Sequence, residues 1–301
     1  MSDIKLFETK NETATEIPGS ASALEKSLQN LMERNLETLL GVRFLASEYS
    51  TGPKHGGRID TLGLDENGCP VIVEYKRATN ENVINQGLFY LDWLLDHRAE
   101  FQLLVMEKLG QEAADEIDWS TPRLLCVAGG FTRYDEHAVQ QMDRNIELIR
   151  YCRFGDELLL LELVNATSSE SGADEQKMPD AVYYKTITET LEELGGPLLD
   201  LYEETRAFLL ALGDDVQEKK LKFYVAFKRI KNFVCLEVYP SKGCVRAYLK
   251  VDPENVFLED GFTRDVRKIG HLGTGDLEIT LRSRADLEKA RELFQQSYDA
   301  S

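Results

Sequence analysis

The alternation of apolar and polar positions is interrupted at residues 166–180, where the stretch ATSSESGADEQKMPD is small, polar and acidic. Such a segment has no apolar period with which to pack and is typical of a linker. We therefore expect one domain at 20–165 and a second at 181–301, with a polar tail at 1–19. A length of 301 residues also suits two domains rather than one.

Before the linker, apolar periods near 3.6 and near 2 alternate, which predicts a mixed α/β sheet flanked by helices. Helices are expected at 20–40, 80–97, 99–115 and 134–144, and strands at 43–49, 57–64, 70–77 and 123–130, followed by strands in IELIRYCRF and ELLLLELV. The continuous apolar run Val71-Ile72-Val73 indicates a central strand that is covered on both faces.

After the linker, the pattern predicts a smaller α+β domain. Helices are expected at 185–195, 197–213 and 284–298, and strands at 222–229, 232–240, 244–251 and 276–282. No internal repeat is visible in either half.

The segment GGRIDTLGLDENGCPVIVEYKR contains the first candidate chemistry, because it predicts two strands joined at Glu66-Asn67-Gly68. Glycine stands where a three-residue hairpin loop needs a left-handed residue. If the residues that flank this loop pair with each other, Asp60 faces Glu74 directly. Arg58 then faces Lys76 on the same side of the sheet.

Two carboxylates at directly opposed positions repel each other unless a cation lies between them. Mg²⁺ suits such a site, because it accepts one or two carboxylates and keeps several waters. Lys76, two positions after Glu74, points to the same side of its strand and is placed to orient or deprotonate a water. The alternative is that Glu74 and Lys76 only form the solvent face of an amphipathic strand, which is how most Glu-x-Lys triplets arise.

The first helix supplies a further candidate acid. On a helical projection, Glu25 falls within a stripe formed by leucines and Met32, whereas Glu33 and Glu37 project away from it and are expected to be solvated. A carboxylate on a buried stripe needs a partner. We therefore expect Glu25 to be the outer ligand of the metal and its waters, with Glu33 in reserve.

These residues resemble the PD-(D/E)XK nuclease superfamily, in particular its NucS and RecB-like branch. The elements that carry the resemblance are Glu25 on helix one, Arg58-Ile59-Asp60, Glu74-Tyr75-Lys76, and Gln86-x-x-x-Tyr90 on the next helix. The resemblance covers roughly residues 20–130. It implies a restriction-endonuclease-like fold with Asp60, Glu74 and Glu25 as Mg²⁺ or Mn²⁺ ligands and as catalytic residues.

The same resemblance assigns Lys76 as the catalytic lysine and gives Gln86 and Tyr90, with Arg58, a supporting role beside nucleic acid. NucS-like enzymes carry a separate N-terminal DNA-binding domain, and this chain has only a short polar stretch there, so their substrate preference does not transfer. Trp93 lies on the same helical stripe as Tyr90. An aromatic at that spacing indicates either a core position or a base-stacking platform.

Charge is distributed unevenly along the chain. The net charge of −18 disfavours nucleic-acid binding, yet residues 216–270 hold 12 Lys and Arg against 7 Asp and Glu, which leaves −23 on the other 246 residues. Aromatic residues alternate with the cations in this region, namely Phe223, Tyr224, Phe227 and Phe233. This pattern fits a groove for single strands, and it equally fits strands with core and solvent-facing positions.

The remaining composition concerns location and partners. The five cysteines lie far apart without CxxC spacing, and neither a signal peptide nor a membrane-spanning run is present, so a reducing, cytoplasmic setting without membrane contact is expected. The sequence predicts a metal-dependent nuclease that acts on nucleic acid, most simply DNA. The alternative is a non-catalytic module with the same fold that binds nucleic acid or protein, and the C-terminal domain is the expected surface for a protein partner or a homo-oligomer.

Overall fold

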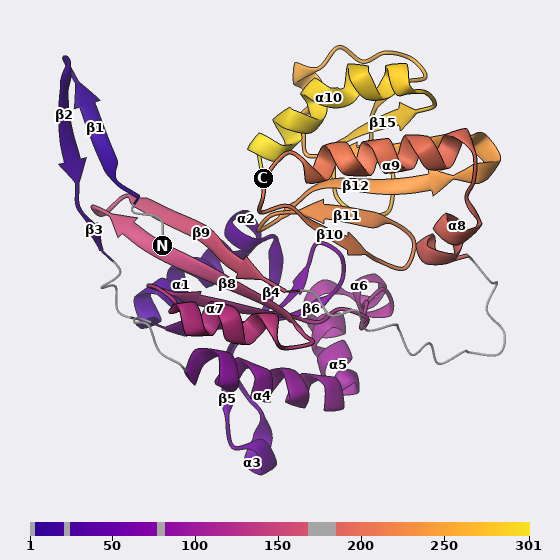
Figure 1. Cartoon of the computed structure of the whole chain (residues 1–301). Coiled ribbons are helices and arrows are strands. Elements are labelled where there is room, and N and C mark those ends of the chain that lie inside the picture. The colour runs from indigo at the N-terminus through magenta and orange to yellow at the C-terminus, as the bar shows by residue number, and fades with distance from the viewer. Residues whose placement is uncertain (1–3, 21–24, 77–81, 168–184) are drawn as a thin grey trace. The chain divides into compact units, whose positions relative to one another are not determined.

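The computed structural model describes residues 4–20, 25–76, 82–167 and 185–301. The chain forms two compact units, Met1–Ala173 and Asp174–Ser301 (Figure 1). The division falls within the segment expected as a linker, most of which lies outside the described residues.

The first unit is built on a mixed sheet in the order β3-β8-β7-β6-β5-β4, with β9 also paired to β8. The central strands β6, β7 and β8 are parallel, and the other pairs are antiparallel. The strands are β3 (Gly19–Ser20), β4 (Val42–Ser50), β5 (Arg58–Asp65), β6 (Pro70–Lys76), β7 (Arg123–Ala128), β8 (Asn145–Phe154) and β9 (Leu158–Ala166). The expected mixed α/β fold with a buried central strand is confirmed.

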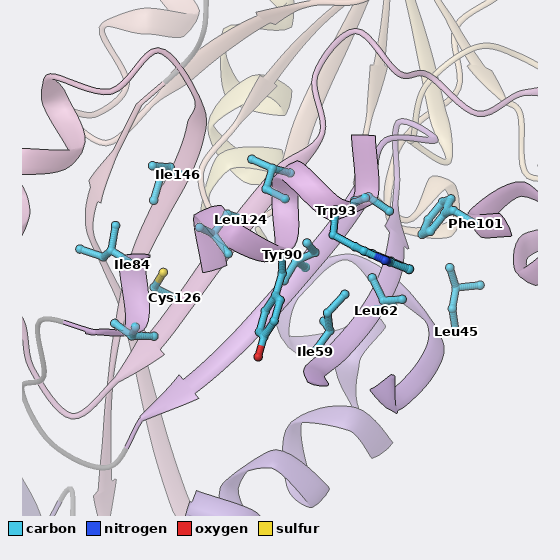
Figure 2. Close-up of a cluster of buried hydrophobic side chains, with 14 of the residues drawn as sticks. Leu45, Ile59, Leu62, Ile84, Tyr90, Trp93, Phe101, Leu124, Cys126 and Ile146 are labelled. Atoms are coloured by element: carbon cyan, nitrogen blue, oxygen red, sulfur yellow. The ribbon is translucent and has the colours of Figure 1, made fainter. Parts of the chain in front are cut away.

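Seven helices accompany this sheet within the described part of the first unit. They are α1 (Glu25–Arg34), α2 (Leu36–Leu40), α3 (Gly52–His55), α4 (Asn82–Asp96), α5 (Arg98–Leu109), α6 (Gln111–Asp115) and α7 (Arg133–Gln140). Apolar side chains of α4 to α7 pack with those of the sheet strands in one buried cluster, of which Figure 2 shows the part around Trp93 and Leu124. This packing fixes α4, which follows β6 in the chain, against the sheet.

The N-terminal segment differs from the expected polar tail. It forms a two-stranded antiparallel hairpin of β1 (Leu6–Lys10) and β2 (Thr13–Ile17), whose residues are mostly exposed. Its turn residues Asn11 and Glu12 both have positive φ, 48° and 63°, as a two-residue hairpin turn requires. The apolar residues of these strands, Leu6, Phe7, Ala14 and Ile17, do not alternate with polar ones, so a search based on hydrophobic periodicity does not detect the strands.

The second unit is a sheet with helices, as expected. Its six strands follow the order β10-β11-β12-β13-β15-β14 with antiparallel pairing throughout. The elements are α8 (Ile187–Glu193), α9 (Pro197–Leu210), β10 (Gln217–Lys220), β11 (Val225–Lys228), β12 (Asn232–Tyr239), β13 (Cys244–Leu249), β14 (Thr263–Asp265), β15 (Leu277–Leu281) and α10 (Arg284–Asp299). The short polar strands β10 and β14 escaped prediction because QEKK and TRD contain no apolar position.

Buried side chains from this sheet and from the helices α8 to α10 form a separate core. None of the helices in the described ranges of either unit is long and apolar enough to cross a membrane.

Candidate active site

The β5–β6 hairpin has the register that its loop predicts. The pairs run from Leu64 opposite Pro70 to Thr61 opposite Val73, and Gly68 adopts a φ of 75° in the loop. Asp60 and Glu74 therefore occupy the next position beyond the last pair, Thr61 and Val73, on adjacent antiparallel strands. The predicted pairing of Arg58 with Lys76 lies further along, beyond the pairs that the ladder forms.

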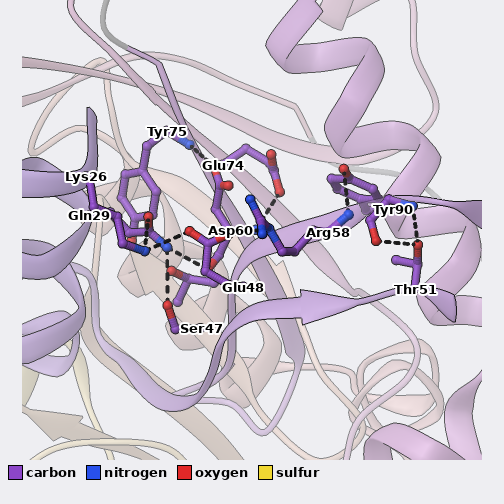
Figure 3. A network of polar contacts seen from close by, with 12 residues as sticks. Lys26, Gln29, Ser47, Glu48, Thr51, Arg58, Asp60, Glu74, Tyr75 and Tyr90 are labelled. Carbon is purple, nitrogen blue, oxygen red and sulfur yellow. Dashed lines mark hydrogen bonds and ion pairs between the residues drawn. The ribbon is translucent and has the colours of Figure 1, made fainter. Parts of the chain in front are cut away.

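Each of the two carboxyl groups accepts a hydrogen bond from the opposite strand at the end of the ladder (Figure 3). The backbone N–H of Asp60 donates to Glu74 Oε1 at 3.1 Å, and the N–H of Tyr75 donates to Asp60 Oδ2 at 3.0 Å. Each carboxylate thus accepts from the backbone of the opposite strand. These two bonds place both carboxyl groups at the same end of the hairpin.

Glu74 is fully buried, and Oε2 of its carboxylate has no hydrogen-bond partner among the described residues. Burial, followed by the charge of Asp60, raises the pKa of Glu74 to about 9. A buried carboxylate with an unsatisfied oxygen is unfavourable unless it holds a proton or meets a cation. The position therefore suits a carboxyl group that either holds a proton or meets a cation.

Lys76 is the last residue of β6 and is partly exposed. Its charge lowers the pKa of Glu74, against the effect of burial, so its ammonium lies within electrostatic range of the carboxyl pair. The sequence interpretation placed Glu25 in the same cluster. Glu25 is the first residue of α1, but its side chain lies outside the described residues.

Helix α1 contributes a residue that the sequence interpretation missed. Gln29 is buried, and its amide group donates to the backbone oxygen of Asp60 at 2.9 Å and to Glu33 Oε1 at 2.9 Å. Glu33 also accepts from Thr61 Oγ1 at 2.7 Å. The expectation that Glu33 is solvated is wrong, because β5 covers this side of the helix. Gln29 lies four positions after Glu25 and borders the apolar stripe, but the helical pattern does not indicate that β5 covers it.

Glu48 of β4 is a second residue that the sequence interpretation missed. It has a positive φ of 53°, and its carboxylate pairs with Lys26 at 2.7 Å and with Arg58 at 2.5 Å. Lys26, through a hydrogen bond and its charge, and Arg58 hold the pKa of Glu48 below its usual value. Nothing in the alternating pattern of β4 indicates this conformation, so sequence alone gave no signal for it.

Tyr90 connects α4 to the start of β5. Its hydroxyl accepts from the backbone N–H of Arg58 at 3.1 Å and from Gln86 Nε2 at 3.2 Å. A Cβ at Gly57 would lie 2.5 Å from the Tyr90 ring, so glycine permits this approach. Trp93, in contrast, is a core residue with 2% exposure, which excludes it as a stacking platform.

Several cations of the segment 216–270 are engaged in ion pairs. Arg229 pairs with Asp215, Arg264 with Glu278, and Arg267 with carboxylates that include Asp265. Three of its four interleaved aromatics are buried, namely Tyr224, Phe227 and Phe233. Phe227 and Phe233 occupy core positions of β11 and β12, and Tyr224 is buried just before β11, so none of the three offers a surface for bases.

Comparison with known proteins gives little functional information. A family model described as a domain of unknown function (DUF5655) matches residues 187–301. A protein of Haemophilus influenzae described as uncharacterized is 29% identical over 308 residues, covering 98% of this chain and 99% of that protein.

Two solved structures also match, each over less than half of either chain. A repair endonuclease from Pyrococcus abyssi is 20% identical, with a TM-score of 0.30 over 42% of this chain and 46% of its own. A structure of an EndoMS-dsDNA2 complex is 21% identical, with a TM-score of 0.29 over 48% of each chain. Both scores are too low to support a functional argument, which therefore has to come from the residues of the site.

The donor set fits a hard divalent cation with few protein ligands. Among the described residues, no group of three or more His, Cys, Asp or Glu side chains is arranged to hold a metal ion. The site offers two converging carboxylates, Asp60 and Glu74, with the unsatisfied Glu74 Oε2. Mg²⁺ binds through one or two carboxylates and completes its octahedron with water and substrate oxygens, so this pair suffices.

Proposed function

We propose that the Asp60–Glu74 site hydrolyses phosphodiester bonds in nucleic acid, with DNA as the substrate, and depends on Mg²⁺ or Mn²⁺. The observation that carries the proposal is the convergence of these carboxyl groups at the open end of the β5–β6 ladder, with Glu74 buried and its Oε2 unsatisfied. The order of motifs, which resembles that of PD-(D/E)XK nucleases, supports it.

Asp60 and Glu74 would hold the metal, which supplies charge stabilisation to the phosphoryl oxygens and lowers the pKa of a water. The protein keeps both carboxylates in position through backbone N–H groups, so that they need not reorganise when the cation binds. Gln29 fixes the backbone of Asp60 from α1, and Tyr90 fixes that of Arg58 from α4. These contacts hold the strand on both sides of Asp60.

Lys76 would act on the water and the phosphate rather than on the metal. Its position two residues after Glu74 puts it on the same side of β6, and its partial exposure leaves it accessible to substrate. An ammonium there orients the attacking water and stabilises charge that develops on the phosphoryl group.

Incubation of the full chain with circular and linear DNA, each both single-stranded and duplex, tests this function. We expect cleavage with Mg²⁺ or Mn²⁺ and none with a chelator, because the carboxyl pair alone provides no Lewis acid. Circles have no ends, so cleavage of a circle identifies an endonuclease, and cleavage confined to linear forms identifies an exonuclease. Equal cleavage in chelator and in metal would contradict the proposal, as would no cleavage of any form.

A further inference from the structure

Three aromatic rings form a strip beside the candidate active site, composed of His55 from α3, Phe89 from α4 and His97 from the junction of α4 and α5. The His55 ring lies 5.4 Å from Phe89 and 5.7 Å from His97, measured between centroids. Phe89 is 46% exposed, which is unusual for a phenylalanine on a helix whose other large apolar residues include buried Tyr90 and Trp93. We call these three residues the aromatic strip.

The aromatic strip rests on the core of the first unit. His97 stacks on Trp93 at 4.7 Å with an interplanar angle of 16°, and its Nδ1 lies 2.8 Å from the backbone oxygen of Trp93. Trp93 belongs to the buried cluster in Figure 2. Phe89 in turn contacts the ring of Tyr90, with centroids 6.0 Å apart. The strip is therefore held in place by buried residues. A ligand that stacks on it would need to immobilise few further side chains.

Covalent and hydrogen-bond links tie the aromatic strip to the carboxyl pair. His55 precedes Asp60 by five residues, a separation of at most about 18 Å. This corresponds to about five nucleotides stacked at 3.4 Å each. Tyr90, which contacts Phe89, also accepts the backbone N–H of Arg58. A strand bound at Asp60 thus reaches the strip within a few nucleotides.

The charges near Phe89 decide which part of a nucleotide fits. Asp92 and Asp96 are exposed on α4, three and seven residues after Phe89, and so share its side of the helix. These carboxylates repel phosphate groups. The part of a nucleotide that fits the strip is therefore the base, which can stack on an aromatic face while its phosphates lie elsewhere.

We propose that the aromatic strip stacks an unpaired base of the DNA strand that enters the Asp60–Glu74 site. This inference rests on the proposed function for the identity of the ligand. A base in duplex DNA is already stacked on both faces and cannot reach Phe89 without leaving its helix. The preferred substrate is therefore single-stranded DNA or DNA with a frayed or displaced strand.

Binding of a fluorescein-labelled deoxythymidine 20-mer to the full chain in chelator tests the proposal, with fluorescence anisotropy as the readout and cleavage suppressed. Phe89→Ala is expected to weaken binding by roughly 5- to 150-fold, the range for loss of one base–aromatic contact. Phe89→Trp is expected to retain it. Phe257→Ala is the matched control, because Phe257 of the second unit is 88% exposed and loses the same side chain.

A second readout reports stacking itself. A single-stranded oligonucleotide with 2-aminopurine is expected to lose fluorescence on binding the wild-type chain and to lose less on binding Phe89→Ala. Single-strand affinity that is unchanged in Phe89→Ala, or lowered equally in Phe257→Ala, would overturn the proposal. So would tighter binding of the matching duplex than of the single strand.

The nuclease proposal and the aromatic-strip proposal can be refuted independently of each other. Cleavage by the wild-type chain combined with normal single-strand binding by Phe89→Ala would sustain the nuclease and refute the strip. Loss of binding in Phe89→Ala without any metal-dependent cleavage by the wild-type chain would sustain the strip and refute the nuclease.

Discussion

The backbone N–H of Asp60 donates to Glu74 Oε1 at 3.1 Å, one residue beyond the last pair of the β5–β6 ladder. This bond lowers the pKa of Glu74, against the larger effects of burial and of the Asp60 charge. The fold thus brings two carboxyl groups together, and this hydrogen bond offsets only part of the rise in the pKa of Glu74.

The first prediction concerns pH. The pKa of Glu74 is about 9 in the folded chain, against 4.5 for an ordinary glutamate. The stability that its proton provides is fully present below pH 4.5, and it is lost as pH rises from 4.5 through 9, by up to about 1.4 kcal/mol per pH unit. Because the two acids interact, this titration belongs to the Asp60–Glu74 pair.

Urea denaturation in chelator between pH 5 and pH 8 measures this effect. Glu74→Gln keeps the shape of the side chain but cannot ionise, so the variant should gain stability relative to the wild type as pH rises. A stability difference between the two proteins that does not change with pH would show that Glu74 titrates normally.

The second prediction concerns the anchor of β5. Tyr90→Phe removes the hydroxyl that accepts from Arg58 and Gln86, and should reduce the free energy of unfolding by about 1 kcal/mol. Tyr134→Phe is the matched control, because the Tyr134 hydroxyl is bound only by exposed Arg133 among the described residues. Its effect should stay within about 0.5 kcal/mol. Equal losses in the two variants, measured by denaturant unfolding, would contradict the anchoring role.

The third prediction concerns a buried ion triad in the same sheet. Arg123 binds Asp65 at 2.8 Å and Glu147 at 2.8 and 2.9 Å, and all three side chains are buried. Arg123→Met leaves two buried carboxylates without their cation and should cost about 3–5 kcal/mol in the free energy of unfolding.

The control for Arg123→Met is Lys5→Met, which removes the cation of an exposed pair with Glu16. Its cost should be below about 1 kcal/mol. If thermal or urea unfolding shows comparable losses for the two substitutions, burial does not decide the strength of these pairs.

Sequence reasoning located the carboxyl pair because the hairpin is local. The loop around Gly68 fixes the register, and register places Asp60 next to Glu74. The helix acid was harder to assign, because a helical projection does not say which side of α1 a strand covers. Contact with β5 buries Gln29 and engages Glu33, and no local pattern encodes that contact.

Two further outcomes depended on tertiary structure. The sequence pattern allowed Trp93 either a core or a surface position. The packing of α4 against the sheet places it in the core. Glu48 has its left-handed conformation at the point where its carboxylate pairs with Lys26 of α1 and Arg58 of β5. Both partners lie on other elements of the fold. Alternation of apolar residues predicts strands but not such irregularities within them.

The fourth prediction separates the lysine from the carboxylates. Lys76→Ala should abolish cleavage, because no ammonium remains to orient the water, but it should leave metal binding largely intact, since lysine is not a ligand. Cleavage assays and calorimetric titration with Mn²⁺ measure the two properties. Loss of metal binding in Lys76→Ala, or full cleavage without the lysine, would contradict this division of roles.

The proposed function requires Asp60 and Glu74 to hold a divalent cation, and the melting temperature in the presence of Mn²⁺ measures that binding. A cation that binds the folded state raises the melting temperature in a concentration-dependent way. The wild-type chain should show this rise, and Asp60→Asn should abolish it together with cleavage. If Asp60→Asn folds and keeps the full Mn²⁺-induced shift, the cation binds elsewhere and the proposed site is wrong.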